Sequence, residues 1–363
     1  MNATRLRQTR EAGFSLTELM VAMVIGLIAS LVIQQMFTIF AASSRTATSV
    51  ADAQENGLFA LVSIERDVRI AGYGLASDAL LNCSTTHAYK RDPSMAGLAG
   101  PLQNFTLRGF SITDGGANSD TLLLQYGTSV RADVDAEITK DMADSSSELT
   151  VSNTAGFNVK DLIVAAQNGN CTLMQVTEIE TATYKIQHDH QASEVTYNPP
   201  AAYQVSPPAP DTPWPAYLPG AKLYNLGDLV SRRYTIGNNS LRVEENGGAP
   251  TEMVRDIVTI QAQYGVTADP ASKSVTQWVD PIGAWANPSI NDYKRIKAIR
   301  VAVVARANRR ELTPVSPATI KLWPDAAAGQ STVGPTYTVP DRNYRYKVYE
   351  TIAPLRNAIW GSP

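Results

Sequence analysis

A long apolar segment near the N-terminus constrains this chain more than any other feature of its sequence. The segment runs from Phe14 to Ala42 and contains one charged residue, Glu18. About 20 helical residues, at ~1.5 Å each, cross the hydrocarbon core of a bilayer, so the segment predicts a transmembrane helix. A carboxylate deep in lipid costs about 2.5–3.5 kcal/mol. We therefore expect Glu18 to have a partner or to reach the membrane interface, one helical turn away.

Charges before the apolar segment predict its orientation. Arg5, Arg7 and Arg10 precede it, against one acid, Glu11. A basic flank stays on the cytoplasmic side, so we expect a single-pass protein with a cytoplasmic N-terminus. Two simpler interpretations compete. The apolar run is too long for a cleaved secretory signal peptide, and a plain signal anchor explains neither Glu18 nor the glycine before the segment.

The residues around Gly13 resemble a known processing site. Residues 13–19 read Gly-Phe-Ser-Leu-Thr-Glu-Leu, which is similar to the cleavage site of type IV prepilins and pseudopilins. The resemblance implies that prepilin peptidase removes the leader, residues 1–13, and that Phe14 becomes the N-methylated first residue. It also implies that Glu18 docks the subunit into a filament by pairing with the Phe14 amine, its own or a neighbour's. The implied location is the bacterial inner membrane, with a periplasmic head, and then the pilus, at its tip.

The helix is expected to continue beyond its transmembrane half, residues 14–42. Residues 43–72 contain no proline and end at Gly72-Tyr73-Gly74, a strong helix stop. An apolar stripe in this amphipathic half predicts that it packs on a soluble domain. The stripe consists of Leu58, Leu61, Val62, Ile64 and Val68, with Glu65 and Arg69 on the same arc.

The remaining sequence predicts a large β-rich head. After residue 72 the apolar runs become short, β-branched and separated by Gly, Asn, Asp and Pro. We expect an α+β fold in which the long N-terminal helix precedes a pilin-like head of antiparallel sheet. Eight prolines between residues 199 and 220 predict a loop between two β-rich segments, 73–198 and 221–363. Typical pilin heads are much smaller, which favours a rare subunit over the bulk subunit of a fibre.

Ten segments of the head have the pattern of strands. They are Thr121–Tyr126, Glu148–Val151, Leu162–Ala166, Thr172–Glu178, Tyr184–His188, Asp228–Ile236, Ser240–Glu244, Ile257–Val266, Ile296–Arg306 and Arg345–Thr351. The residues Gly237-Asn238-Asn239 predict a hairpin between two of them. In residues 296–306 an apolar face alternates with a mixed face that includes Arg300, as in a sheet with one face on a core.

Several of these segments resemble PilW-type minor pilins. They are Asp120–Gly127, the Cys171 segment ending in Gln175-Val176-Thr177, Leu229–Tyr234, Gln261–Val266 and Ile299–Arg306. The resemblance implies a subunit that acts with other minor pilins and the major pilin to prime type IV pili for twitching or cell adhesion. Operons of this kind often also encode a large tip adhesin. The alternatives are a minor pseudopilin of a type II secretion system, a membrane-anchored β-rich adhesin or binding module, and an anchored enzyme.

Two cysteines, Cys83 and Cys171, lie in the part predicted to be extracytoplasmic, where disulfides form. A bridge between them would close a loop of about 90 residues and stabilise the fold by ~4–5 kcal/mol in the chain-entropy model. Two unpaired thiols are the alternative. No second Cys or His lies at ligand spacing from either residue, which argues against a metal site.

The sequence lacks the motifs of common catalytic and cofactor sites, including G-x-S-x-G, H-E-x-x-H, the Walker loop and the dinucleotide fingerprint. We therefore expect no enzymatic activity and no cofactor. His188-Asp189-His190 and the loop 114–120 are weak candidates for a metal and for calcium, with polar turns as the simpler interpretation. A basic cluster between Lys294 and Arg310 fits a solvated face. The net charge of −3 does not favour nucleic acid as a partner.

Overall fold

The computed structural model describes residues 13, 15–91, 99–101, 106–131, 135–142, 148–189, 197–198, 217–323 and 335–360. The chain forms two compact units, residues 1–52 and 53–363. Residues 1–12 of the predicted leader, Phe14, His190 and most of the predicted Pro-rich loop lie outside the described residues.

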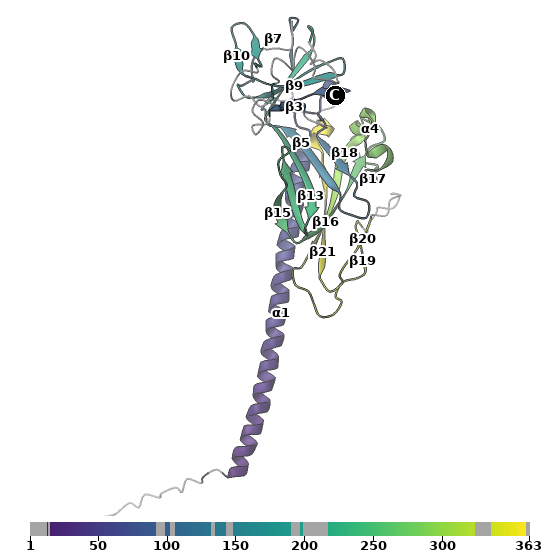
Figure 1. Ribbon diagram of the computed structural model, residues 1–363. Coiled ribbons are helices and arrows are strands. Elements are labelled where there is room, and N and C mark those ends of the chain that lie inside the picture. Colours follow the sequence, from purple (N-terminus) through teal and green to yellow (C-terminus); the bar gives the residue numbers. More distant parts are fainter. Residues whose placement is uncertain are drawn as a thin grey trace, which may run out of the picture. The chain divides into compact units, whose positions relative to one another are not determined.

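Helix α1 (Leu16–Ile70) is one uninterrupted helix (Figure 1). Every residue from Leu16 to Arg45 is exposed, and the most apolar stretch of the helix has a mean hydropathy of 2.4. The length and composition of α1 therefore suit a membrane span. Gly72 and Gly74 follow the helix with φ angles of 80° and 74°, a left-handed conformation that glycine adopts without strain.

Two antiparallel sheets form the part of the second unit on which residues 53–70 of α1 pack. The five-stranded sheet has the order β15 (Thr251–Arg255), β14 (Ser240–Glu245), β13 (Leu229–Gly237), β5 (Thr121–Gly127) and β4 (Phe110–Thr113). The four-stranded sheet has the order β17 (Gln277–Val279), β16 (Ile257–Val266), β18 (Ile296–Arg306) and β21 (Tyr346–Pro354). Together with α1 they confirm the predicted α+β class.

A second group of strands forms the rest of the head. A mixed sheet has the order β1 (Thr85–His87), β9 (Asn170–Gln175), β8 (Leu162–Gln167), β12 (Lys222–Gly227) and β6 (Asp135–Glu137), with β1 and β9 parallel. Beside it are the three-stranded sheet β10 (Glu178–Glu180), β11 (Lys185–Gln187) and β7 (Glu148–Thr150), and the pair β2 (Tyr89–Arg91) with β3 (Ala99–Pro101). A further pair, β19 (Thr319–Lys321) with β20 (Thr336–Thr338), packs on the four-stranded sheet through Ile320 and Tyr337.

The sheets do not divide at the predicted Pro-rich loop. Strand β12 follows the loop in sequence but pairs with β8 and β6, which precede it. Strand β5 precedes the loop but pairs with β13, which follows it. The two five-stranded sheets therefore combine strands from both β-rich segments, whereas the three-stranded and four-stranded sheets each lie within one segment.

Local sequence explains the clearest strand features. Strands β13 and β14 are joined by Asn238 and Asn239, both with φ near 55°, as a tight two-residue hairpin requires. The predicted strand 172–178 is divided in the structure, because β9 ends at Gln175 and β10 begins at Glu178. The prediction that only one face of β18 lies on a core was wrong, because the strand is buried on both faces except at Arg306.

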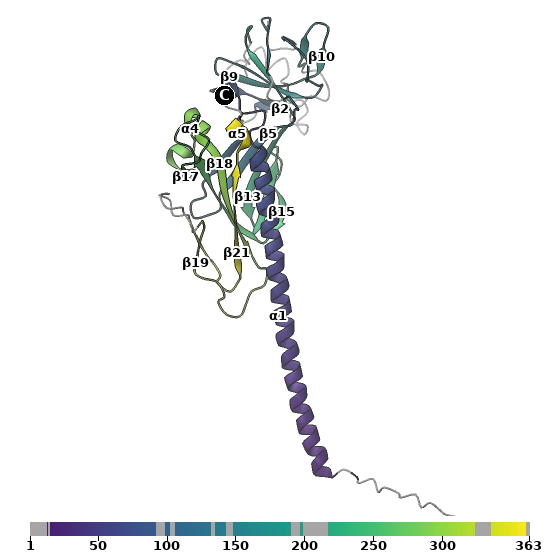
Figure 2. The same cartoon turned by 180° about the vertical axis from the view of Figure 1, so that it is seen from behind.

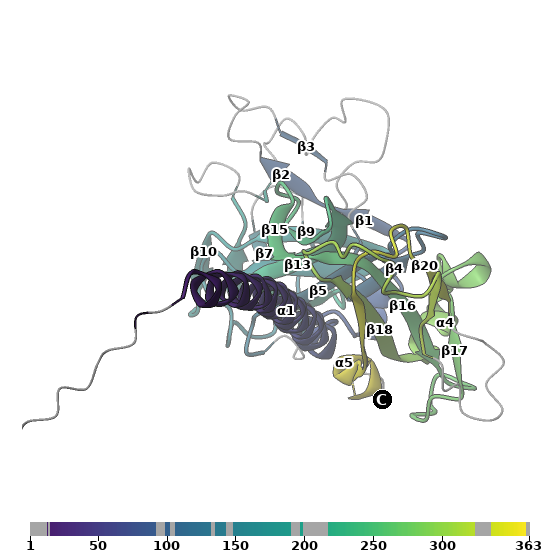
Figure 3. The same ribbon diagram turned by 90° about the horizontal axis from the view of Figure 1, so that it is seen from below.

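Short helices complete the second unit. Helix α2 (Asp78–Leu81) follows the α1 stop, helix α4 (Ile290–Arg295) precedes β18, and a 3-10 turn, η1 (Gly283–Trp285), lies between β17 and α4. Helix α5 (Arg356–Trp360) contacts β18 (Figure 3). The Nδ2 of Asn357 in α5 donates to the carbonyl oxygens of Ile70 and Ala71, at 3.0 and 3.1 Å. Helix α5 thus supplies a donor to two carbonyls at the end of α1, of which that of Ile70 also accepts the backbone N–H of Tyr73 at 3.1 Å.

Candidate assembly site

The first turn of α1 is closed by a reciprocal pair of hydrogen bonds. The backbone N–H of Glu18 donates to Oγ of Ser15 at 3.2 Å, and the backbone N–H of Ser15 donates to Oε2 of Glu18 at 2.9 Å. This arrangement is a capping box, which satisfies two N–H groups that a helix N-terminus otherwise leaves open. The acid at this position also favours the positive end of the helix dipole.

The capping box adds a local role to the predicted docking residue. The carboxylate that was expected to bind the Phe14 amine already accepts a bond from the backbone N–H of Ser15, the residue after Phe14. Its Oε1 accepts no bond from a described residue, so one oxygen is available for a second donor. The signal for this role was in the sequence, because Ser15-Leu16-Thr17-Glu18 fits the S-x-x-E pattern. Gly13 is exposed and lies in open space.

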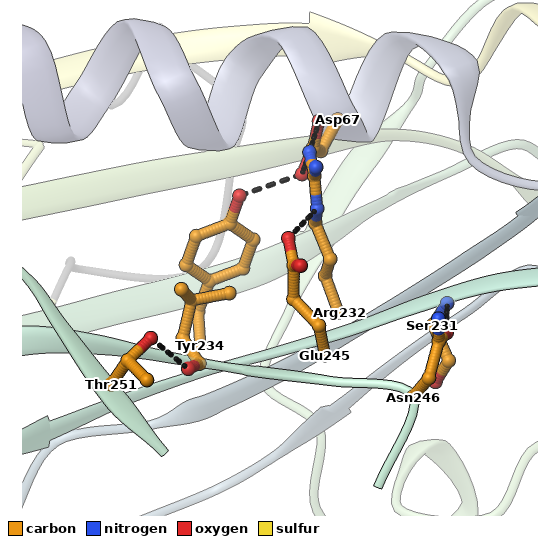
Figure 4. Close-up of polar contacts among 8 residues, drawn as sticks. Asp67, Ser231, Arg232, Tyr234, Glu245, Asn246 and Thr251 are labelled. Carbon is orange, nitrogen blue, oxygen red and sulfur yellow. Dashed lines mark hydrogen bonds and ion pairs between the residues drawn. The ribbon is translucent and has the colours of Figure 1, made fainter. Parts of the chain in front are cut away.

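A buried charge fastens the other end of α1 to the five-stranded sheet (Figure 4). Asp67 is 1% exposed, and both of its oxygens accept bonds from Nη1 of Arg232, at 3.1 and 3.0 Å. The hydroxyl of Tyr234 donates to Oδ2 of Asp67 at 2.6 Å. Glu245, directly opposite Arg232 on β14, accepts a bond from Nε of Arg232 at 2.8 Å.

Three hydrogen bonds to the Asp67 carboxylate offset the free-energy cost of burying its charge. The residues of this cluster are Asp67, Arg232, Tyr234 and Glu245. Burial raises the pKa of the Tyr234 phenol, and its bond to Asp67 raises it further. The hydroxyl therefore stays protonated as a donor. No sequence motif points to Asp67, although its partners Arg232 and Tyr234 lie in the Leu229–Tyr234 segment, which resembles PilW-type minor pilins. An acid at the spacing of Ile64 and Ala71, on the head-facing side, was the available signal.

The side of α1 that packs on the head differs from the predicted stripe. The buried residues are Ala53, Gly57, Ala60, Leu61, Ile64, Asp67, Val68 and Ala71, which recur with helical spacing. Leu58 and Val62 were predicted to pack on the head, but they are 52% and 59% exposed. Phe59, beside them, is 55% exposed. The prediction was therefore wrong for Leu58 and Val62 and confirmed for the other three residues of the stripe.

Gly57 explains why the helix lies so close to the four-stranded sheet. A Cβ at this position would overlap the ring of Tyr349 on β21 and would come within 3.2 Å of the Cβ of Ala305 on β18. A glycine inside a helix costs about 1 kcal/mol relative to alanine. Here the missing side chain leaves room for an aromatic ring.

A disulfide between Cys83 and Cys171, with their Cα atoms 5.7 Å apart, cross-links the second group of strands to the segment that follows α2. Cys83 follows α2 and Cys171 lies in β9. Of the two alternatives that the sequence left open, the structure contains the bridge. The bridge lies within the second unit and stabilises the head.

The weaker candidates from the sequence have structural roles. Asp120 accepts bonds from the N–H groups of Gly115 and Ala262, at 2.9 and 2.8 Å, and its burial raises its pKa to about 6. His188 is buried at the end of β11, whereas His190 lies outside the described residues. Within the described ranges, no group of three or more His, Cys, Asp or Glu side chains could hold a metal ion.

The predicted basic cluster does not form one free patch. Lys294 pairs with Asp78 at 2.7 Å, Arg295 with Asp292 at 2.9 Å, and Arg310 with Asp341 at 3.0 Å. Lys297 donates to the Ala358 carbonyl oxygen at 2.8 Å. Arg300 is buried between the rings of Trp278 and Trp323 and donates to Gln263. These charges hold elements of the head together.

An apolar N-terminal helix, of which residues 53–70 pack on an antiparallel head, is the arrangement that the sequence resemblance to pilins predicts. A family model for the prokaryotic N-terminal methylation motif matches residues 8–33. A second model, for type IV pilus-assembly protein W, matches residues 224–357. Each match covers less than half of the chain, and together they support its similarity to PilW-type pilin-like proteins of type IV pilus systems. Neither a curated protein nor a solved structure matches it.

The two matched ranges contain most of the candidate site. Gly13, Phe14, Ser15 and Glu18 fall within the methylation motif. The PilW range includes the two residues of β13 that bind Asp67, as well as β16, β18 and β21. Asp67 itself lies between the two matched ranges.

Proposed function

We propose that this protein is a minor pilin that helps to initiate and assemble type IV pili, as a non-enzymatic subunit of a priming complex at the membrane and then at the pilus tip. The observation that carries the proposal is the presence of both family matches on one chain with a helix suited to span a membrane. The large head, with its second group of strands, supports a rare subunit over the repeating one.

Maturation would begin at the N-terminus. Prepilin peptidase would cut between Gly13 and Phe14 on the cytoplasmic side of the inner membrane, and the new Phe14 amine would be methylated. The amine of a neighbouring subunit would then bind the oxygen of Glu18 that the capping box leaves available. A charge-assisted hydrogen bond of this kind contributes about 1.5–3 kcal/mol, which is enough to select a docked subunit by about tenfold or more.

The outward side of α1 supports filament assembly by a second route. Leu58, Phe59 and Val62 lie on the side of α1 opposite the buried residues, and all three are more than half exposed. A helix that is apolar on both sides needs a partner on each. The head covers one side. The helices of neighbouring major or minor pilins would cover the other.

Two substitutions test the docking role because they separate charge from capping. Glu18→Gln keeps a side-chain acceptor for the Ser15 N–H, since glutamine also serves in capping boxes, but removes the charge. Ser15→Ala removes the cap and keeps the charge. We expect peptidase cleavage in both variants, a tenfold or larger loss from sheared pili for Glu18→Gln, and near-normal incorporation for Ser15→Ala.

Immunoblots of membranes and of sheared pili give both readouts. Normal incorporation of Glu18→Gln would show that charge pairing does not dock this subunit. Gly13→Ala should leave a longer, uncleaved protein in the membrane, whereas a mature-sized band would move the junction elsewhere. The intact mass of the mature protein gives its first residue and the methylation state of that residue. A mature protein that begins at unmethylated Phe14, or at another residue, would contradict the proposed processing.

A further inference from the structure

Strand β21 has an unusual open edge. Within the described part of the chain, the other strands that end a sheet of three or more strands are short: β1, β6, β7, β10 and β17 have three residues each, β4 has four and β15 has five. Strand β21 has nine and ends the four-stranded sheet (Figure 2). Proteins usually keep exposed edges short because unpaired N–H and C=O groups invite another strand.

The regular pairing of β21 defines which groups face outward. Its register with β18 has no shift from end to end. The bonds Leu355 N–H to Lys297 O and Ala307 N–H to Arg345 O mark the residues that pair with β18. Because pairing alternates along an antiparallel ladder, the N–H groups of Val348, Glu350 and Ile352 point away from β18. Among the described strands, none pairs with that side.

The side chains of β21 suit an interior strand better than an edge. Lys347 and Pro354, near its ends, are the usual protective residues. The six residues between them contain no Lys, Arg or Pro, and three of them are β-branched. Ile352 is 58% exposed, and of all the residues of β21 only Ala353 is buried. Tyr346 and Val348 are partly buried against Leu322 and Trp323, so an added strand would continue an existing apolar surface.

We propose that the open edge of β21 accepts an extended strand from a different subunit of the pilus assembly, a partner that follows from the proposed function. Backbone pairing would supply affinity, and apolar residues opposite Val348 and Ile352 would supply selectivity. In the added strand, the residue opposite Glu350 would be basic or neutral. The Glu350 carboxylate already accepts the backbone N–H of Trp323 at 2.7 Å.

A second copy of this chain is a poor occupant. Two β21 edges could pair antiparallel with their outward N–H groups in register. Full overlap places Glu350 directly opposite Glu350 of the second copy, and a shift by two residues in either direction places the two glutamates diagonally beside each other. Like charges in those positions destabilise a strand pair. The chemistry of the edge therefore favours a strand of another sequence.

Site-specific photo-cross-linking in piliated cells tests the proposal on the full-length protein. A benzophenone amino acid replaces Ile352, and a matched control replaces Gln277, which is exposed on the three-residue edge strand β17. We expect cross-links from position 352 to an extended segment of another pilus subunit, mapped by mass spectrometry, and none at position 277. Products that map mainly to a second copy, or no product, would overturn the proposal.

A matched pair of substitutions then distinguishes backbone pairing from simple proximity. Val348→Pro removes one outward N–H, which an edge strand tolerates, whereas Val348→Ala keeps the N–H and shortens the side chain. Loss of one backbone bond should reduce the cross-link about five- to tenfold in Val348→Pro, and by less than about twofold in Val348→Ala. Equal yields in the two variants would exclude strand addition.

A third variant guards against misfolding and against failure of the proposed function. Ile352→Lys places the usual edge-protecting residue on an exposed position, so folding should be unaffected while recovery with other pilus subunits falls several-fold. Cleavage at Gly13 and presence in sheared pili are measured in the same cells. If both are normal but neither Val348→Pro nor Ile352→Lys lowers recovery of the partner, the edge assignment fails alone. If the protein is neither cleaved at Gly13 nor present in sheared pili, the proposed function fails.

Discussion

Helix α1 between Ala53 and Ala71 has two apolar sides that differ in residue size and in exposure. The side that packs on the head includes the small residues Gly57 and Ala60 and one buried acid, Asp67. The opposite side carries the large residues Leu58, Phe59 and Val62 and is exposed. Small residues let a helix approach a sheet closely, whereas large exposed ones provide area for a partner. Apolar character alone therefore does not identify the side that the head occupies.

The largest expected effect is on the buried charge of the head-facing side. Asp67→Ala removes all three hydrogen bonds of the carboxylate, leaves the Tyr234 hydroxyl buried without its acceptor and leaves Arg232 with Glu245 alone. We expect a loss of about 3 kcal/mol in the free energy of unfolding, at the lower end for a broken buried pair because Arg232 is one-third exposed. Urea unfolding of the full-length protein in detergent, followed by tryptophan fluorescence, measures it.

Asp67→Asn is the matched control, because its amide oxygen still accepts one bond. The expected loss is about half as large. If Asp67→Ala costs less than about 1 kcal/mol, the cluster does not fasten α1 to β13, and packing of the apolar residues alone holds the helix.

The next effect concerns the close approach at Gly57. Gly57→Ala adds a Cβ that overlaps the Tyr349 ring, and overpacking of this kind costs about 1–3 kcal/mol. Alanine returns about 1 kcal/mol through its higher helix propensity, so we expect a net loss of about 1 kcal/mol in the same unfolding measurement.

A double substitution sharpens this prediction. In a Tyr349→Ala background the overlap is gone, so Gly57→Ala should become neutral or stabilising. The same loss in both backgrounds would mean that the glycine is not required by the aromatic ring.

The elements that the sequence predicted correctly have strong local signals. Helix α1 has a long apolar run, a capping pattern and a glycine stop, and β16 and β18 have long β-branched runs. The hairpin at Asn238 depends on turn chemistry within two residues. Strands such as β4, β12 and β15 were not predicted, because short strands are stabilised by partners distant in sequence and not by their own pattern.

The candidate site divides in the same way. Gly13, Phe14 and Glu18 stand together in one short motif, so the sequence alone is enough to propose them as candidates. Asp67 is 165 residues from Arg232, so its role depends on a contact that only the fold creates. The prediction that Leu58 and Val62 pack on the head was wrong because the predicted apolar stripe was centred on large side chains. The sheet instead packs against the side of α1 that includes the small residues Gly57 and Ala60.

The smallest effect on stability is expected on the exposed side. Val62→Ser and Phe59→Ser change side chains that are more than half exposed, so the free energy of unfolding should change by no more than about 0.5 kcal/mol. Incorporation into sheared pili should nevertheless fall several-fold, because each substitution removes apolar area that a neighbouring helix would bury. Glu55→Ser, also exposed on this part of α1, is the control and should leave both quantities unchanged. If the Phe59 and Val62 variants lose stability and not incorporation, the exposed side serves the fold, and the contrast between the two sides of α1 is wrong.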